Sequence, residues 1–124
     1  MGIESINAIT FRVKDMARSI DFYLALSFEL RFGGSDEKFS SLASGSCFVN
    51  LMVADPVETG WGRVIFHVDD VDTLFELALA AGLTAQAPPR DAPWGERMFA
   101  IFDPDGHDLS FARPLSPAAD DHGH

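Results

Sequence analysis

The side chains of this chain that could recognise or transform a small molecule stand at alternate positions in short segments rich in β-branched and aromatic residues. Alternate residues of a strand share one face, and here the partner faces carry only hydrocarbon. A face that mixes cations, amides and hydroxyls with apolar groups is either solvated or lines a ligand pocket, and we interpret it as a pocket wall. The mixed faces are expected to carry Phe48 and Asn50; Arg63, Ile65 and His67; and Asp108 and Ser110.

Each of these polar groups has a functional and a structural interpretation. The Arg63 guanidinium suits a ligand carboxylate, phosphate or carbonyl, or else an acid of the protein itself. His67 is either an acid–base group or a hydrogen-bonded structural residue. Trp94 lies in an irregular segment near Arg97, where it could stack on a planar ligand or pack on the sheet as a lid. No nucleophile motif and no glycine-rich phosphate loop is present.

Composition limits the partners. The chain has 124 residues, of which 47% are hydrophobic and 23% charged, as in a globular protein. Its net charge of −10 repels nucleic acids and anionic membranes, so neither is an expected partner. The first residues lack the basic and apolar regions of a signal peptide, so a cytoplasmic location is expected.

An internal repeat organises the elements that must position these groups. The segment 9–15 matches the segment 64–70, and the register continues through a helix that each segment's final aspartate can cap, Asp15 or Asp70. Short strands are then expected at 28–32, 39–43 and 47–54, and at 84–87, 97–102 and 108–113, with a loop at 88–95. The predicted fold is α+β: two βαβββ modules, about 5–55 and 62–114, in one domain 1–114, with mixed sheets curled around a cleft, helices outside and a flexible tail at 115–124.

Three segments carry a family resemblance: ITFRVKDMARSIDFYLALSFEL, GRVIFHVDDVDTLFELALAAGL and PWGERMFAIFDPDGHDLSFARP. They resemble the vicinal oxygen chelate superfamily, which includes glyoxalases, extradiol dioxygenases, and fosfomycin- and bleomycin-resistance proteins. The resemblance puts the four metal-ligand positions of that family on Ala8, Asn50, Arg63 and Ser110. Alanine cannot ligate a metal, arginine repels one, and asparagine and serine are weak neutral donors. It therefore implies a branch without metal or other cofactor.

Two functions are compatible with the absence of the family's metal ligands. The first is a metal-free binding protein for a small organic molecule, such as an antibiotic-sequestering protein. The second is a lyase, isomerase or oxygenase of the same superfamily with an atypical site, for which a shifted metal set of His67 and Asp108 is conceivable. A homodimer is expected, because small members of the superfamily commonly close the cleft with a second chain. The predicted ligand-binding residues are Phe48, Asn50, Arg63, Ile65, His67, Trp94, Arg97 and Ser110.

Overall fold

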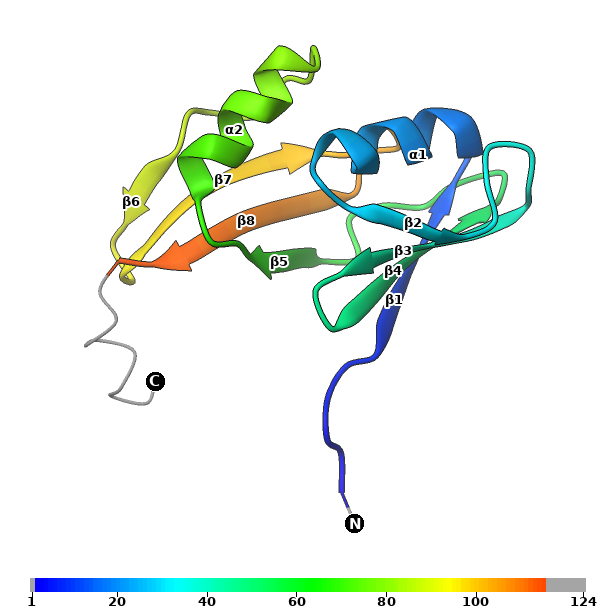
Figure 1. The fold of residues 1–124 in the computed structure, drawn as a ribbon, viewed down its shortest axis with the longest axis horizontal. Helices are drawn as coiled ribbons and strands as arrows, with labels where there is room; N and C mark the ends of the chain where they lie inside the picture. The colour runs from blue at the N-terminus through cyan, green and yellow to red at the C-terminus, as the bar shows by residue number, and fades with distance from the viewer. Residues whose placement is uncertain (1, 116–124) are drawn as a thin grey trace. The chain divides into compact units, whose positions relative to one another are not determined.

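Each half of the chain folds as the predicted βαβββ module in the computed structural model, which describes residues 2–115 (Figure 1). The chain divides into unit 1, Met1–Glu58, and unit 2, Thr59–His124. The sequence thus predicts the α+β class and the element order correctly. The flexible tail predicted for 115–124 falls, apart from its first residue, outside the described residues.

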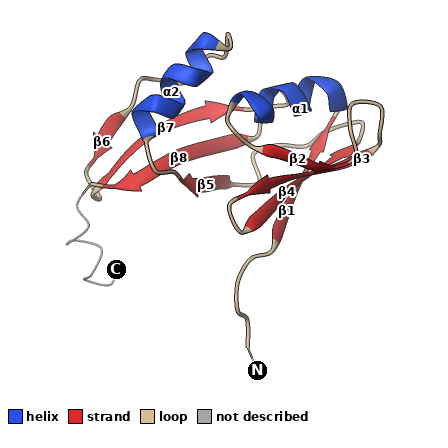
Figure 2. Ribbon diagram, in the orientation of Figure 1, coloured by secondary structure: helices blue, strands red, loops and turns tan. Residues whose placement is uncertain are grey.

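Unit 1 is a four-stranded mixed sheet with one helix on one face (Figure 2). Its strand order is β1-β4-β3-β2, in which β1 is parallel to β4 and the other pairs are antiparallel. The elements are β1 (Ala8–Val13), α1 (Met16–Ala25), β2 (Glu29–Phe32), β3 (Phe39–Ser44) and β4 (Cys47–Val53).

Unit 2 repeats this arrangement with the strand order β5-β8-β7-β6, again with its first and last strands parallel and adjacent. Parallel strands need a crossover connection. In each unit the helix follows the first strand in the chain and lies on one face of the sheet. The elements are β5 (Arg63–His67), α2 (Val71–Ala80), β6 (Arg90–Ala92), β7 (Glu96–Phe102) and β8 (Asp108–Pro114).

Local signals define both helix ends. The Asp15 carboxylate accepts a hydrogen bond from the Arg18 backbone N–H at 3.1 Å, and Asp70 accepts one from Thr73 at 3.0 Å. The Thr73 backbone N–H holds the pKa of Asp70 below its usual range, because it stabilises the charged carboxylate. Beyond the helix ends, Gly82 takes a φ of 84° and Ser27 a φ of 74°, so the serine adopts a left-handed conformation that favours glycine.

The hydrocarbon faces of the strands pack beneath the helices. In unit 1, Phe11 and Leu51 are buried, and Phe11 stacks on Tyr23 of α1 with ring centroids 6.0 Å apart. In unit 2, Phe99 lies between Phe75 of α2 and Phe111, at 5.5 and 5.4 Å. The opposite face of each sheet, turned away from its own helix, is called here its open face.

One predicted strand is wrong. Residues 84–87 form no strand, and β6 lies instead at Arg90–Ala92, inside the segment predicted as a loop. The Gln86 backbone N–H still reaches the Ala100 carbonyl at 2.9 Å. Pro88 and Pro89 have no backbone N–H, so the ladder stops there and resumes where Arg90 pairs with Met98.

Among the described residues, no helix is long and apolar enough to cross a membrane.

Candidate functional site

The open face of unit 2 has a floor of small side chains. Register places Ser110 of β8 between Ile65 of β5 and Ala100 of β7, and places Ala112 between His67 and Met98. Ser110 and Ala112 are buried even though they lie on the face without a helix. Side chains of the flanking strands contribute to this burial, because Arg63 contacts Ser110 and the His67–Glu96 contact crosses β8.

Arg63 covers one end of this floor. Its Nη1 lies 3.5 Å from the buried Ser110 hydroxyl and its Nε 4.0 Å from the Asp108 carboxylate. Both distances are at the long limit for such contacts, and 48% of the Arg63 side chain stays exposed. The other oxygen of Asp108 is buried without a hydrogen-bond partner within residues 2–115. The guanidinium thus keeps donors for a further group.

His67, Glu96 and Trp94 form a polar cluster at the other end of the floor. The His67 Nε2 lies 3.1 Å from Oε2 of Glu96, and the Trp94 indole N–H donates to Oε1 of Glu96 at 3.0 Å. Glu96 and His67 lie two strands apart, so their contact crosses β8 above Ala112. The Arg90 guanidinium lies over the Trp94 ring, 5.8 Å from its centroid.

Glu96 was missed by the sequence analysis. It lies between the predicted loop at 88–95 and the predicted strand at 97–102, whereas β7 begins at Glu96. The alternation that puts Phe99 and Ile101 under the helix puts Met98 and Glu96 on the open face, and that alternation is the signal that identifies it.

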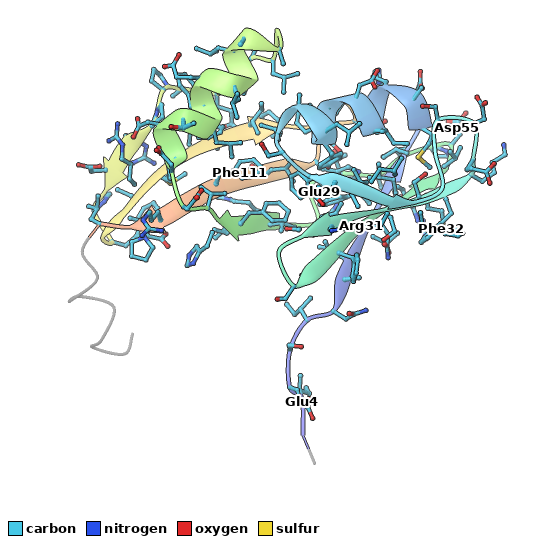
Figure 3. All side chains as sticks on the ribbon, in the orientation of Figure 1. Glu4, Glu29, Arg31, Phe32, Asp55 and Phe111 are labelled. Carbon is cyan, nitrogen blue, oxygen red and sulfur yellow. The ribbon has the colours of Figure 1, made fainter. Side chains whose placement is uncertain are left out.

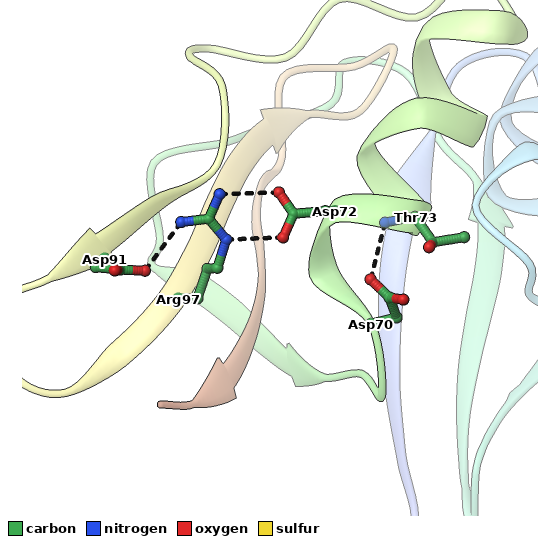
Figure 4. Close-up of polar contacts among 5 residues, drawn as sticks. All are labelled: Asp70, Asp72, Thr73, Asp91 and Arg97. Carbon is green, nitrogen blue, oxygen red and sulfur yellow. Dashed lines mark hydrogen bonds and ion pairs between the residues drawn. The ribbon is translucent and has the colours of Figure 1, made fainter. Parts of the chain in front are cut away.

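The structure does not bring Arg97 to this face. Arg97 shares the helix side of β7 with Phe99, where its guanidinium binds both carboxylate oxygens of Asp72 at 2.7 and 2.9 Å and one of Asp91 at 2.9 Å (Figure 4). The hydrogen bond from Arg97 lowers the pKa of Asp72, and the two carboxylates raise the pKa of Arg97. Arg97 therefore ties β7 to α2 and β6.

A pocket of about 230 Å³ lies at the start of α2 in unit 2, lined partly by Arg97 and Asp72. Arg97 and Asp72 are already paired with each other, and the pocket is also lined by Asp69, Asp70 and Arg113. The open face is the better candidate.

Unit 1 presents Phe48 and Asn50 on its own open face. The Asn50 amide donates to the Thr10 hydroxyl at 3.4 Å across the β1–β4 pair. Further along this sheet, Phe32 and Phe39 are exposed with ring centroids 6.4 Å apart. Figure 3 labels Phe32 together with Glu29 and Arg31 of β2, and the latter two form an ion pair at 2.9 Å.

The four family metal positions do not fit a divalent cation. Asn50 and Ser110 are neutral, and they contact Thr10 and Arg63, respectively. The other two positions hold the methyl group of Ala8 and the guanidinium of Arg63. Metal binding needs deprotonated carboxylates or imidazoles. Within residues 2–115, no three His, Cys, Asp or Glu side chains gather as a ligand set.

The alternative set of His67 and Asp108 is not brought together either. Asp108 pairs with Arg63 in the β5–β8 register, and Arg63 and His67 stand four positions apart on β5. That separation is about 13 Å along the strand. Asp108 is also paired with Arg63, and His67 is paired with Glu96.

Comparison with known proteins places this arrangement in a family. The model of the Glyoxalase/Bleomycin resistance protein/Dioxygenase superfamily matches residues 5–111. The chain belongs to this superfamily. An uncharacterised protein of Mycobacterium bovis is 32% identical over 120 residues, covering 83% of this chain and 79% of the relative.

Solved structures share the superfamily fold. TioX from Micromonospora sp. ML1 is 27% identical with a TM-score of 0.74, over 90% of this chain and 100% of that one. The fosfomycin resistance protein FosX from Mesorhizobium loti is 20% identical with a TM-score of 0.75, over 96% of this chain and 98% of that one. At 20% identity, the likeness to FosX concerns the fold alone.

Proposed function

We propose that this superfamily member is a metal-free binding protein for a small organic molecule, with antibiotics as a candidate ligand class. The observation that carries the proposal is the half-exposed Arg63 guanidinium above the buried Ser110 hydroxyl. A cation with open donors on a face of small and apolar residues suits an oxygen-rich group of a ligand. The superfamily's name includes bleomycin resistance proteins, which supports the antibiotic class.

Exposed apolar side chains on the same face support a ligand with an apolar body. Ile65 is 57% exposed, Phe102 51% and Trp94 61%. Ile65 and Phe102 lie at the Arg63 end of the face, whereas Trp94 lies at the Glu96 end. Exposed large apolar groups commonly mark a binding site. We propose that the site comprises Phe48, Asn50, Arg63, Ile65, His67, Trp94 and Ser110, with Glu96 added and Arg97 left out.

The proposal further takes residues 1–114 as one domain of two modules, about 5–55 and 62–114. Asn50→Ala in unit 1 and Arg63→Ala in unit 2 test whether each module contributes to ligand binding. A loss confined to Arg63→Ala would show that unit 2 binds alone.

Native mass spectrometry of the full chain is the direct test. It should show a co-purified organic molecule that is retained by the wild type and lost from Arg63→Ala. It should also show a homodimer, at twice the 13.5 kDa of one chain. A bare chain that takes up neither bleomycin nor any molecule from the extract of its own source cells would contradict the proposal. Cell fractionation tests the proposed cytoplasmic location.

The second candidate function is an enzyme of the same superfamily. One observation favours it: the His67–Glu96 pair is arranged as a proton-transfer pair, with a second group holding the carboxylate.

A further inference from the structure

Arg63 and Asp108 stand side by side on the open face of unit 2, but they are only loosely paired. They are neighbours in the β5–β8 register, yet Nε of Arg63 lies 4.0 Å from Oδ2 of Asp108. That distance is too long for a hydrogen bond. The other oxygen of Asp108, Oδ1, is buried and has no hydrogen-bond partner within residues 2–115. The guanidinium and the carboxylate therefore form a pair that a third group can complete.

A ligand can reach both members of this pair. The Arg63 side chain is 48% exposed and the Asp108 side chain 34%. Because Oδ1 is buried, a ligand reaches the carboxylate from the side of Oδ2, which also faces Arg63. The two oxygens of a carboxylate share its negative charge, so an N–H that donates to Oδ2 also offsets the missing hydrogen bond of Oδ1.

The spacing of the pair fits the O–C–N unit of an amide. Standard bond lengths put the oxygen and the nitrogen of such a unit roughly 2.3 Å apart. The amide oxygen can accept from Nε of Arg63 while the amide N–H donates to Oδ2 of Asp108. Two hydrogen bonds of about 2.9 Å then span the 4.0 Å between Nε and Oδ2 if each diverges by less than about 20° from the parallel.

Charged groups fit the pair less well than an amide. A carboxylate would set one of its oxygens against the Asp108 carboxylate, and an ammonium would set its charge against the Arg63 guanidinium. The net charge of −10 on the chain adds to the repulsion of an anion. A neutral group with an acceptor beside a donor is complementary to both residues.

Exposed apolar side chains flank the pair. Phe102 pairs with Asp108 across β7 and β8, and Ile65 follows Arg63 by two residues on β5, so both share the open face. Their Cα atoms are about 12 Å apart by register, and the strand between them carries the small Ser110. Phe102 is 51% exposed and Ile65 57%. A planar apolar body attached to the amide suits this flank.

We propose that Arg63 and Asp108 together bind the amide edge of a neutral, planar ligand, with its carbonyl oxygen on Arg63 and its N–H on Asp108. The ligand class is a ring that contains or carries a carbonyl next to an N–H, as in a lactam, an imide or a primary carboxamide. The inference rests on the proposed binding of a small molecule at Arg63. It adds Asp108, which the proposed site does not include, as a residue that determines specificity.

Three probes of similar size separate the two roles. Benzamide has both the carbonyl and the N–H, methyl benzoate has the carbonyl without the N–H, and benzoate is an anion. Each probe is titrated into the ¹⁵N-labelled full chain, and the backbone amide shifts of Ile65 and Ser110 report the dissociation constant. Arg63→Ala and Asp108→Ala are the test variants. Glu76→Ala is the matched control, because Glu76 is an exposed acid on α2 of the same unit.

The wild type and Glu76→Ala should bind benzamide at least about 10-fold more tightly than methyl benzoate, the factor expected for a charge-assisted hydrogen bond. Both should bind benzoate more weakly than benzamide. Asp108→Ala should abolish the preference for benzamide, leave the affinity for methyl benzoate unchanged and raise the affinity for benzoate, because the repelling carboxylate is gone. A purely structural role of Asp108 would change the affinities for benzamide and methyl benzoate equally. Arg63→Ala should weaken the binding of both neutral probes at least about 10-fold.

Equal affinities of the wild type for benzamide and methyl benzoate, or an Asp108→Ala variant that keeps the preference, would overturn the inference. The wild-type comparison needs no variant, so it decides the matter even if Asp108→Ala does not fold. If the probes bind without this preference but still depend on Arg63, the amide class fails and the proposed binding function stands. If no probe shifts the open-face amides, the inference fails, and a co-purified molecule that is lost from Arg63→Ala would still support the binding function. If nothing binds or co-purifies, both proposals fail.

Discussion

Replacement of Arg63 by alanine separates a ligand-binding role from a structural one. In the folded protein Arg63 makes one ion-pair contact at 4.0 Å and one hydrogen bond at 3.5 Å, with about half of its side chain in solvent. Exposed ion pairs of this kind contribute at most about 1 kcal/mol to stability. For a chain of this size that corresponds to a melting temperature change of about 4 °C or less.

The effect on binding should be larger. A charge-assisted hydrogen bond to a ligand is worth about 1.5–3 kcal/mol. Arg63→Ala should therefore weaken binding of the co-purified ligand about 10- to 150-fold. Arg63→Lys keeps the charge but loses the planar fork, so its loss should be intermediate.

Calorimetric titration and thermal unfolding of the same samples provide the assay. Arg31→Ala is the matched control, because Arg31 is an exposed arginine of unit 1 that is paired with Glu29. If Arg63→Ala melts more than about 10 °C below the wild type and binds as tightly, Arg63 serves the fold. The placement of the binding site at Arg63 would then be refuted.

Three further predictions follow from the metal positions, the helix cap and the turn after α1. Elemental analysis of protein lacking residues 115–124 should find less than one zinc, nickel, iron or manganese ion per chain; one tightly held ion would revive a metalloenzyme. Asp70→Asn keeps a capping group but removes its charge. The free energy of unfolding, measured in urea, should be lower for the variant than for the wild type above the ordinary carboxyl pKa of 3.8. This difference should vanish as the pH falls through the lowered pKa of Asp70 in the folded protein. A deficit that persisted at pH 2 would show that the carboxylate charge is not its cause. Ser27→Gly should raise the free energy of unfolding by up to about 1 kcal/mol and Gly82→Ala should lower it by about 1 kcal/mol, because both positions have a positive φ; equal shifts of both in one direction would contradict this reasoning.

Local features of the fold could be predicted from the sequence because their causes are local. The Asp15 and Asp70 carboxylates accept from backbone N–H groups three residues away, and the Asp103 backbone carbonyl accepts from the Gly106 N–H at 2.9 Å in the predicted turn. Alternating hydrophobicity identified the faces that lie under the helices, as the burial of Phe11 and Phe111 confirms. The repeat then predicted the module order without any knowledge of distant contacts.

Alternation along the strand separates the faces of Arg97 and Glu96, but their partners were decided only by the tertiary structure. The two residues are neighbours in sequence, and a strand that begins at residue 96 sends their side chains to opposite faces. Where β7 begins depends on its pairing with β6 and β8, including the pair of Glu96 with Pro114, far along the chain. The sequence therefore determined which residue types could bind a ligand, whereas strand register decided that Glu96 meets His67 and that Arg97 meets Asp72.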